Sequence, residues 1–167
     1  MPDKRTINRA RNDRRQGKSP STQAGEFVRD EIHKIRRGEH GARSSKQAIA
    51  IALSEARRAG VDLPPPRKGK TSEQTRRKAQ RDYARGHGAP PKRKPSAKRS
   101  RATLAALKRE PRAAASHQAL SRQARTAAAK RSHAERSASA RKAAQTKGPS
   151  KRSAAARKAA RTRARAA

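Results

Sequence analysis

The chain has 167 residues, of which 47 are lysine or arginine and only 12 are aspartate or glutamate, so its formal net charge is +35. It contains no cysteine, which excludes disulfides and thiolate-bound metals. The longest apolar run, residues 48–53, is far shorter than the roughly 20 residues that a membrane-spanning helix needs. No apolar signal segment follows the basic start.

Charge and apolar content change together at about residues 19 and 66. Residues 1–18 carry seven basic and two acidic side chains, residues 19–66 carry eight and six, and residues 67–167 carry 32 and four. The middle region also holds nine of the thirteen Ile, Leu, Val and Phe residues. We therefore predict a basic N-terminal arm (1–18), a helical-pair module (19–66) near the size limit for independent folding, and a basic low-complexity tail (67–167).

The first helix of the module is predicted over about residues 20–37. Ser19 can cap the free amides at a helix start, and Pro20 is tolerated at the first helical position. Apolar residues then recur at spacings of three and four, which gives one apolar stripe. Gly38 is the expected end of this helix.

The second helix is predicted over about residues 45–59. Ser44, followed by Gln47 three residues later, indicates a capping box, and Gly60 supplies a stop signal. Two antiparallel helices would bury one small core between them. The predicted core side chains are Phe27, Val28, Ile32, Ile35, Ile49 and Leu53.

Ile51 lies roughly opposite Ile49 and Leu53 on the second helix. It is either a lone exposed apolar residue or a contact in a homodimer. A homodimer would also help to stabilise so small a core.

The tail consists mainly of Ala, Lys, Arg and Ser, and its prolines divide it into candidate helical segments. These segments span about residues 72–85, 97–109, 112–146 and 150–165. Ala and Arg favour helix, but like charges four residues apart destabilise an isolated one. We therefore predict a mostly α protein whose tail is largely disordered or conditionally helical, and becomes helical when phosphates neutralise it.

Basic residues at this density are typical of nucleic-acid binding, because each cation that replaces condensed counterions on a duplex gains free energy. The charges surround the predicted tail helices, which favours contacts to the phosphate backbone over reading of base edges. Aromatic residues are scarce, which favours duplex DNA or structured RNA over single strands. The candidate backbone contacts are Arg76, Arg77, Lys78, Lys92, Arg93, Lys94, Lys98, Arg99, Arg101, Lys108, Arg109, Lys130, Arg131, Arg141, Lys142, Lys151, Arg152, Arg157, Lys158, Arg161, Arg163 and Arg165.

Nothing in the sequence indicates catalysis. Glu39 and His40 stand near Ser44, but these residue types lie in a polar linker with no cleft to orient them. His33 and His40 are seven residues apart and have no second ligand pair nearby. We therefore predict a non-enzymatic protein without a cofactor, a metal or a small-molecule substrate.

Residues 19–28 (SPSTQAGEFV) and 43–60 (RSSKQAIAIALSEARRAG) resemble a family of small basic bacterial proteins. That family is classified as a domain of unknown function and often labelled DNA-binding. The resemblance covers about residues 18–66 and implies no catalytic residues. The tail is similar in composition to the tails of linker histones and bacterial histone-like proteins, although Arg exceeds Lys in parts of it. Together the resemblances imply a bacterial, cytoplasmic, nucleoid-associated protein.

The leading expectation is non-sequence-specific binding and condensation of duplex DNA. The first alternative is a protein that uses the same chemistry on structured RNA or the ribosome. The second is a regulator whose helical module recognises a protein partner or an operator. The linker of about six residues is longer than the three or four usual in a helix-turn-helix, which disfavours operator recognition.

Overall fold

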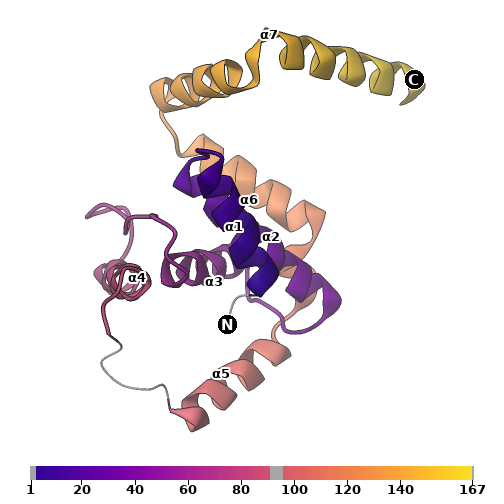
Figure 1. The fold of residues 1–167 in the computed structure, drawn as a ribbon. Coiled ribbons are helices and arrows are strands. Elements are labelled where there is room, and N and C mark those ends of the chain that lie inside the picture. Colours follow the sequence, from indigo (N-terminus) through magenta and orange to yellow (C-terminus); the bar gives the residue numbers. More distant parts are fainter. Residues whose placement is uncertain (1–2, 91–95, 167) are drawn as a thin grey trace. The chain divides into compact units, whose positions relative to one another are not determined.

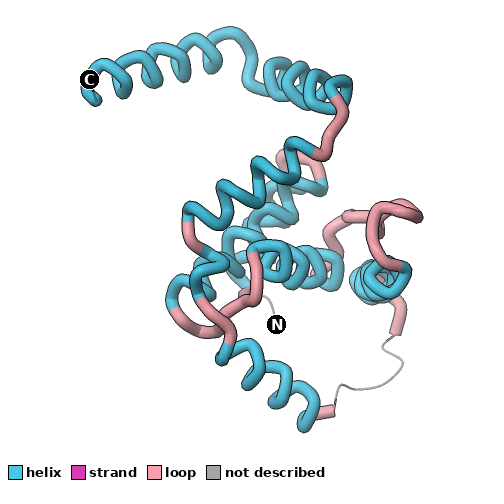
Figure 2. The backbone as a smooth tube through the Cα atoms, turned by 180° about the vertical axis from the view of Figure 1, so that it is seen from behind, coloured by secondary structure: helices cyan, strands magenta, loops and turns pink. Residues whose placement is uncertain are grey.

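The structure is a computed structural model that describes residues 3–90 and 96–166. Within these residues the chain forms seven α-helices and one short 3-10 helix, without strands, so the predicted mostly α fold is confirmed (Figures 1 and 2). The elements are α1 (Lys4–Arg15), α2 (Pro20–Arg37), α3 (Ser45–Arg58), α4 (Glu73–Gly86), α5 (Ala97–Arg109), η1 (Arg112–Ala115), α6 (His117–Ala129) and α7 (His133–Ala166). Contacts divide the chain into two compact units, Met1–Gln123 and Ala124–Ala167.

The predicted helical pair corresponds closely to α2 and α3. Gly38 ends α2 with a φ of 80°, a left-handed conformation that favours glycine. Ser44 accepts a hydrogen bond from the backbone amide of Gln47 at 3.2 Å, and the Gln47 side chain accepts one from the amide of Arg43. Ser19 stands at the start of α2, but its hydroxyl bonds to neighbouring hydroxyls instead of capping an amide.

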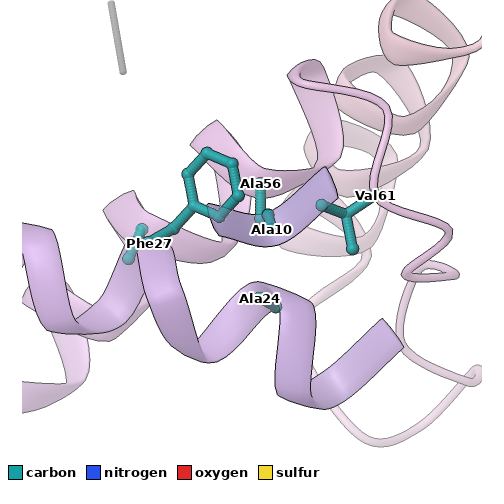
Figure 3. Packing of buried hydrophobic residues seen from close by; sticks show 6 residues of the cluster. Ala10, Ala24, Phe27, Ala56 and Val61 are labelled. Atoms are coloured by element: carbon teal, nitrogen blue, oxygen red, sulfur yellow. The ribbon is translucent and has the colours of Figure 1, made fainter. Parts of the chain in front are cut away.

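Most of the large side chains of the core come from α2. Phe27, Ile32 and Ile35 are buried as predicted, and Val28 and Leu53 are half-buried against the core. In Figure 3 the ring of Phe27 lies beside Ala10 and Ala56. Sequence patterning therefore located the apolar face of α2 correctly.

The buried face of α3 is a seam of small residues. Ala48, Ala52 and Ala56 follow one another at intervals of four, and all are fully buried. Ile49 is only half-buried and is not among the residues that form the two buried clusters. Small side chains on α3 leave room for the large side chains of α2.

The predicted arm contains α1, which packs on α2. Ala10 is buried in the same cluster as Phe27, and Arg9 Nε lies 2.6 Å from Glu26 Oε2 in an ion pair between the two helices. Glu26 therefore helps to hold α1 in place. The compact packing begins before residue 19.

The packing also continues beyond residue 66, because α4 lies against α3. A Cβ atom on Gly86 would stand 1.9 Å from the carbonyl oxygen of Arg57 and 2.9 Å from the amide nitrogen of Gly60. Only glycine at position 86 permits this approach of two backbones. The side chain of Arg57 is buried and donates to the carbonyl of Leu63 at 3.1 Å, which fixes the start of the segment after α3.

A short stretch of the predicted tail is docked on the helical pair. Ala114 and Ala115 are buried beside Ile35. The hydroxyl of Ser45 donates to the carbonyl of Ala114 at 2.6 Å, and Arg36 donates to that of Ala115 at 2.9 Å. Residues 107–115 are therefore part of the folded unit.

Most of the remaining described tail residues lie in helices and few of them are buried, so the expectation of a largely disordered tail is wrong, whereas helicity that depends on phosphates stays a prediction. α5 contains no buried residue, and the helical content follows from the high helix propensity of Ala, Arg and Lys. The predicted break between the segments 112–146 and 150–165 is present, because Gly148 has a non-helical φ of 68° directly before Pro149. α7 is consequently two helical stretches joined at a kink (Figure 1).

Candidate nucleic-acid interface

Most of the predicted backbone contacts lie on exposed faces of the tail helices. Those within the described residues are exposed, except Arg76, which is half-buried. Lys92, Arg93 and Lys94 lie outside the described residues. The others are Arg77 and Lys78 on α4, Lys98, Arg99, Arg101, Lys108 and Arg109 on α5, Lys130 and Arg131 after α6, and Arg141, Lys142, Lys151, Arg152, Arg157, Lys158, Arg161, Arg163 and Arg165 on α7.

The carboxylates of the tail are too few to neutralise these cations. Residues 67–167 contain 32 basic and four acidic side chains. Ion pairs engage Glu73 with Arg76 and Arg77, Asp82 with Arg58, and Glu110 with Arg43. Glu135 accepts a hydrogen bond from the backbone amide of Ser132 at 2.9 Å.

The cations of α5 show this excess most plainly. Over the described residues, no carboxylate lies within ion-pairing distance of Lys98, Arg99, Arg101, Lys108 or Arg109. Exposed, unneutralised cations on a helix without a buried face are suited to polyanion contacts.

The charges of the helical pair are arranged differently. Lys34 lies 2.8 Å from Asp30 in a largely buried ion pair, and Glu31 is 2% exposed with His40 3.6 Å away. Burial raises the pKa of Glu31 above its ordinary value, the neighbouring His40 lowers it, and Glu55 raises it further. The first pair lies within α2, and the second joins α2 to the segment that follows it, so Lys34 is already engaged by a carboxylate.

Ile51, the predicted dimer contact, has neighbours within its own chain. It is half-buried and lines a shallow cavity with Arg58 at the end of α3 and with Lys78 and Asp82 of α4. These neighbours account for part of its burial, and the homodimer contact stays a prediction.

Sequence reasoning missed a second cluster of cations. Arg11 and Arg14 of α1 line a cavity together with Phe27 and Tyr83. The signal was present in the sequence as two arginines three residues apart in a helical segment. Finding the cavity required the packing of α1 on α2.

The described residues offer no sign of a metal centre or a membrane span. They contain no group of three His, Cys, Asp or Glu side chains placed to hold a metal ion. None of their helices combines the length and apolar character needed to cross a membrane.

Comparison with known proteins gives one match. A family model described as a "Family of unknown function (DUF6496)" matches residues 15–68, which is less than half of the chain. No curated protein and no solved structure matches. The matched residues contain α2, α3 and the segment that follows them, and the description names no ligand or activity. The resemblance of the helical pair to a domain of unknown function is therefore confirmed.

Proposed function

We propose that this chain is a non-enzymatic protein that binds nucleic acid through the phosphate backbone without sequence specificity. The observation that supports the proposal is the excess of 32 basic over four acidic side chains in residues 67–167, carried largely by exposed helices. Neutralisation of these cations by phosphates would release condensed counterions and would remove repulsion between neighbouring charges.

Duplex DNA is the favoured target, with condensation of the chromosome or a plasmid as the physiological role. In this proposal the protein is bacterial, cytoplasmic and nucleoid-associated, and its tail acts as the tails of histone-like proteins do. The distribution of cations around α5 and α7 supports contacts to phosphates on more than one side of a helix. Structured RNA presents the same phosphate chemistry and is the second candidate.

The proposal is tested by fluorescence anisotropy of the full chain with two duplexes of scrambled sequence. We expect similar affinities for both duplexes and a steep loss of affinity as salt is added. Strong preference for one sequence would favour a regulator. Crosslinking in cells, followed by sequencing of both DNA and RNA, separates the two targets.

Two variants that lose the same charge at different places distinguish contacts made by the tail from an effect of net charge on DNA binding. The variant R157Q/K158Q removes two exposed cations of α7, and R29Q/K46Q removes two exposed cations of α2 and α3. If the tail makes the contacts, the first variant lowers the salt slope by about two and the second leaves it unchanged. Equal effects would contradict assignment to the tail.

A further inference from the structure

A cavity of about 440 Å³ lies where α1, α2, α4 and the residues after α3 meet. Phe27 and Val61, which are 1% and 5% exposed, form part of its wall together with the half-buried Ile7. The close-up of the core shows Phe27 and Val61 on either side of Ala10 (Figure 3). The volume lies in the range of small-molecule sites, and the lining combines these apolar side chains with polar and charged ones.

Two cations at this cavity have no partner of opposite charge. Arg11 and Arg14 are exposed on α1, and over the described residues neither forms an ion pair. Asp62 also lines the cavity, but it accepts a hydrogen bond from the hydroxyl of Tyr83 at 2.7 Å. Two unpaired guanidinium groups one helical turn apart suit a phosphate, to which arginine donates in a planar fork.

The cavity also presents aromatic rings in a fixed position. The rings of Tyr83 and His87 are stacked with centroids 4.0 Å apart and planes at 21°. Asp62 holds the hydroxyl end of Tyr83, and His87 Nδ1 donates to the carbonyl of Tyr83 at 2.8 Å. Aromatic side chains of this kind supply the stacking platforms of proteins that bind unpaired bases.

An inorganic anion would contact only the two arginines, and an apolar ligand would contact only the apolar side chains. A nucleotide can contact both parts of the cavity. The paired bases of a duplex could not enter. We infer that this cavity binds an unpaired nucleotide, with its base against the apolar wall and the Tyr83–His87 stack and its phosphate against Arg11 and Arg14. The inference rests on the proposed function and adds to it a second site, in the folded unit, for a single base and its phosphate.

Tyr83 supplies a direct readout, because the chain has one tyrosine and no tryptophan. The full chain is titrated with thymidine monophosphate, with thymidine and with inorganic phosphate, and the tyrosine emission is corrected for absorption by the ligand. We expect saturable quenching by the monophosphate, and affinities about tenfold or more weaker for thymidine and for phosphate. Equal affinity for phosphate and the monophosphate would overturn the inference.

Three variants that each lose one arginine of α1 distinguish binding in the cavity from an effect of net charge on affinity. R11Q and R14Q should each weaken binding of the monophosphate by about tenfold, because each removes a charge-assisted hydrogen bond. R15Q removes an equal charge from the same helix outside the cavity lining and should change affinity by less than about twofold. Equal losses in all three variants would assign the effect to net charge and would contradict the site.

A short oligothymidylate and a duplex complete the experiment. Quenching by the oligonucleotide as well as the monophosphate supports a nucleotide within a strand, and quenching by the monophosphate alone supports a free nucleotide. If the duplex binds by anisotropy while neither single-stranded ligand changes the emission of Tyr83, the inference fails and the proposed function stands. If the full chain binds no duplex and no structured RNA, the proposed function itself fails.

Discussion

The hydroxyl of Ser45, at the first position of α3, donates a hydrogen bond of 2.6 Å to the backbone carbonyl of Ala114. Both groups are buried, and the contact joins the helical pair to a segment 69 residues further along the chain. It places the boundary between folded unit and exposed tail well beyond residue 66.

Replacing Ser45 by alanine should destabilise the folded unit. The substitution leaves the carbonyl of Ala114 buried without its partner, which costs about 1–3 kcal/mol of unfolding free energy. Urea unfolding followed by circular dichroism measures the change, and hydrogen exchange should show faster opening at residues 113–116. Ser100→Ala on the exposed face of α5 is the control and should leave stability unchanged. Equal stability of both variants would show that the contact contributes nothing.

Alanine at Gly41 and at Gly25 should have opposite effects on stability. A Cβ atom at position 41 would lie 1.8 Å from the carbonyl oxygen of Glu110, so the docked segment must move. At position 25, inside α2, a Cβ atom meets nothing within 4 Å, and alanine should stabilise the helix by about 0.5–1 kcal/mol. Thermal unfolding of the two variants tests the pair. A stabilised G41A would contradict the close approach.

Substitution of Asp62 by asparagine should change the ionisation of Tyr83. The hydrogen bond that Tyr83 donates to Asp62 raises the pKa of its phenol above the ordinary value. In D62N the pKa should fall back toward that value, because the carboxylate that stabilises the neutral phenol is gone. Ultraviolet absorbance during alkaline titration reads the single tyrosine directly. Glu73→Gln removes the same charge from the start of α4 and should leave the titration unchanged.

Glu31 should make stability depend on pH in a defined direction. Burial raises its pKa in the folded chain, so the folded state takes up a proton at a higher pH than the unfolded state. Relative to E31Q, the wild-type chain should therefore gain stability as pH falls from the raised pKa to the ordinary value of a glutamate. Near neutral pH we expect E31Q to be more stable by about 1 kcal/mol, since Oε1 of Glu31 has no hydrogen-bond partner.

The pH dependence of Glu31 has a matched control. Glu39 is exposed and pairs with Arg37, so Glu39→Gln should change stability by less than about 0.5 kcal/mol at any pH. Chemical unfolding at several pH values gives both differences. A difference between wild type and E31Q that does not vary with pH would contradict the raised pKa.

Local signals predicted the helices well, because caps and stops depend on neighbours in the sequence. Ser44, Gln47 and Gly38 set the bounds of α2 and α3 through contacts within a few residues. The partners of each helix were harder to predict. The docking of Ala115 depends on Ile35 of α2 and Ala48 of α3, which are far away in the sequence. Alanine is also too small and too common in this chain to mark a buried position by itself.

The same limit applies to the candidate sites. The basic tail could be predicted from composition alone, because 32 basic and four acidic residues can be counted in the sequence. The cavity beside Tyr83 was not predictable, since it combines Arg11 of α1 with residues that follow α3. Large apolar side chains were also overvalued, as half-buried Ile49 and fully buried Ala48 show.

The salt dependence of duplex binding tests the central claim most directly. Affinities of the full chain and of a chain ending at Ala129, which keeps α1 to α6 whole, are measured against a random duplex over a range of salt. If the full chain contacts about ten phosphates, log affinity falls with log salt at a slope of about −9, and the shortened chain gives a clearly shallower slope. A full-length chain, freed of contaminating nucleic acid, that binds neither DNA nor RNA in low salt would contradict the account.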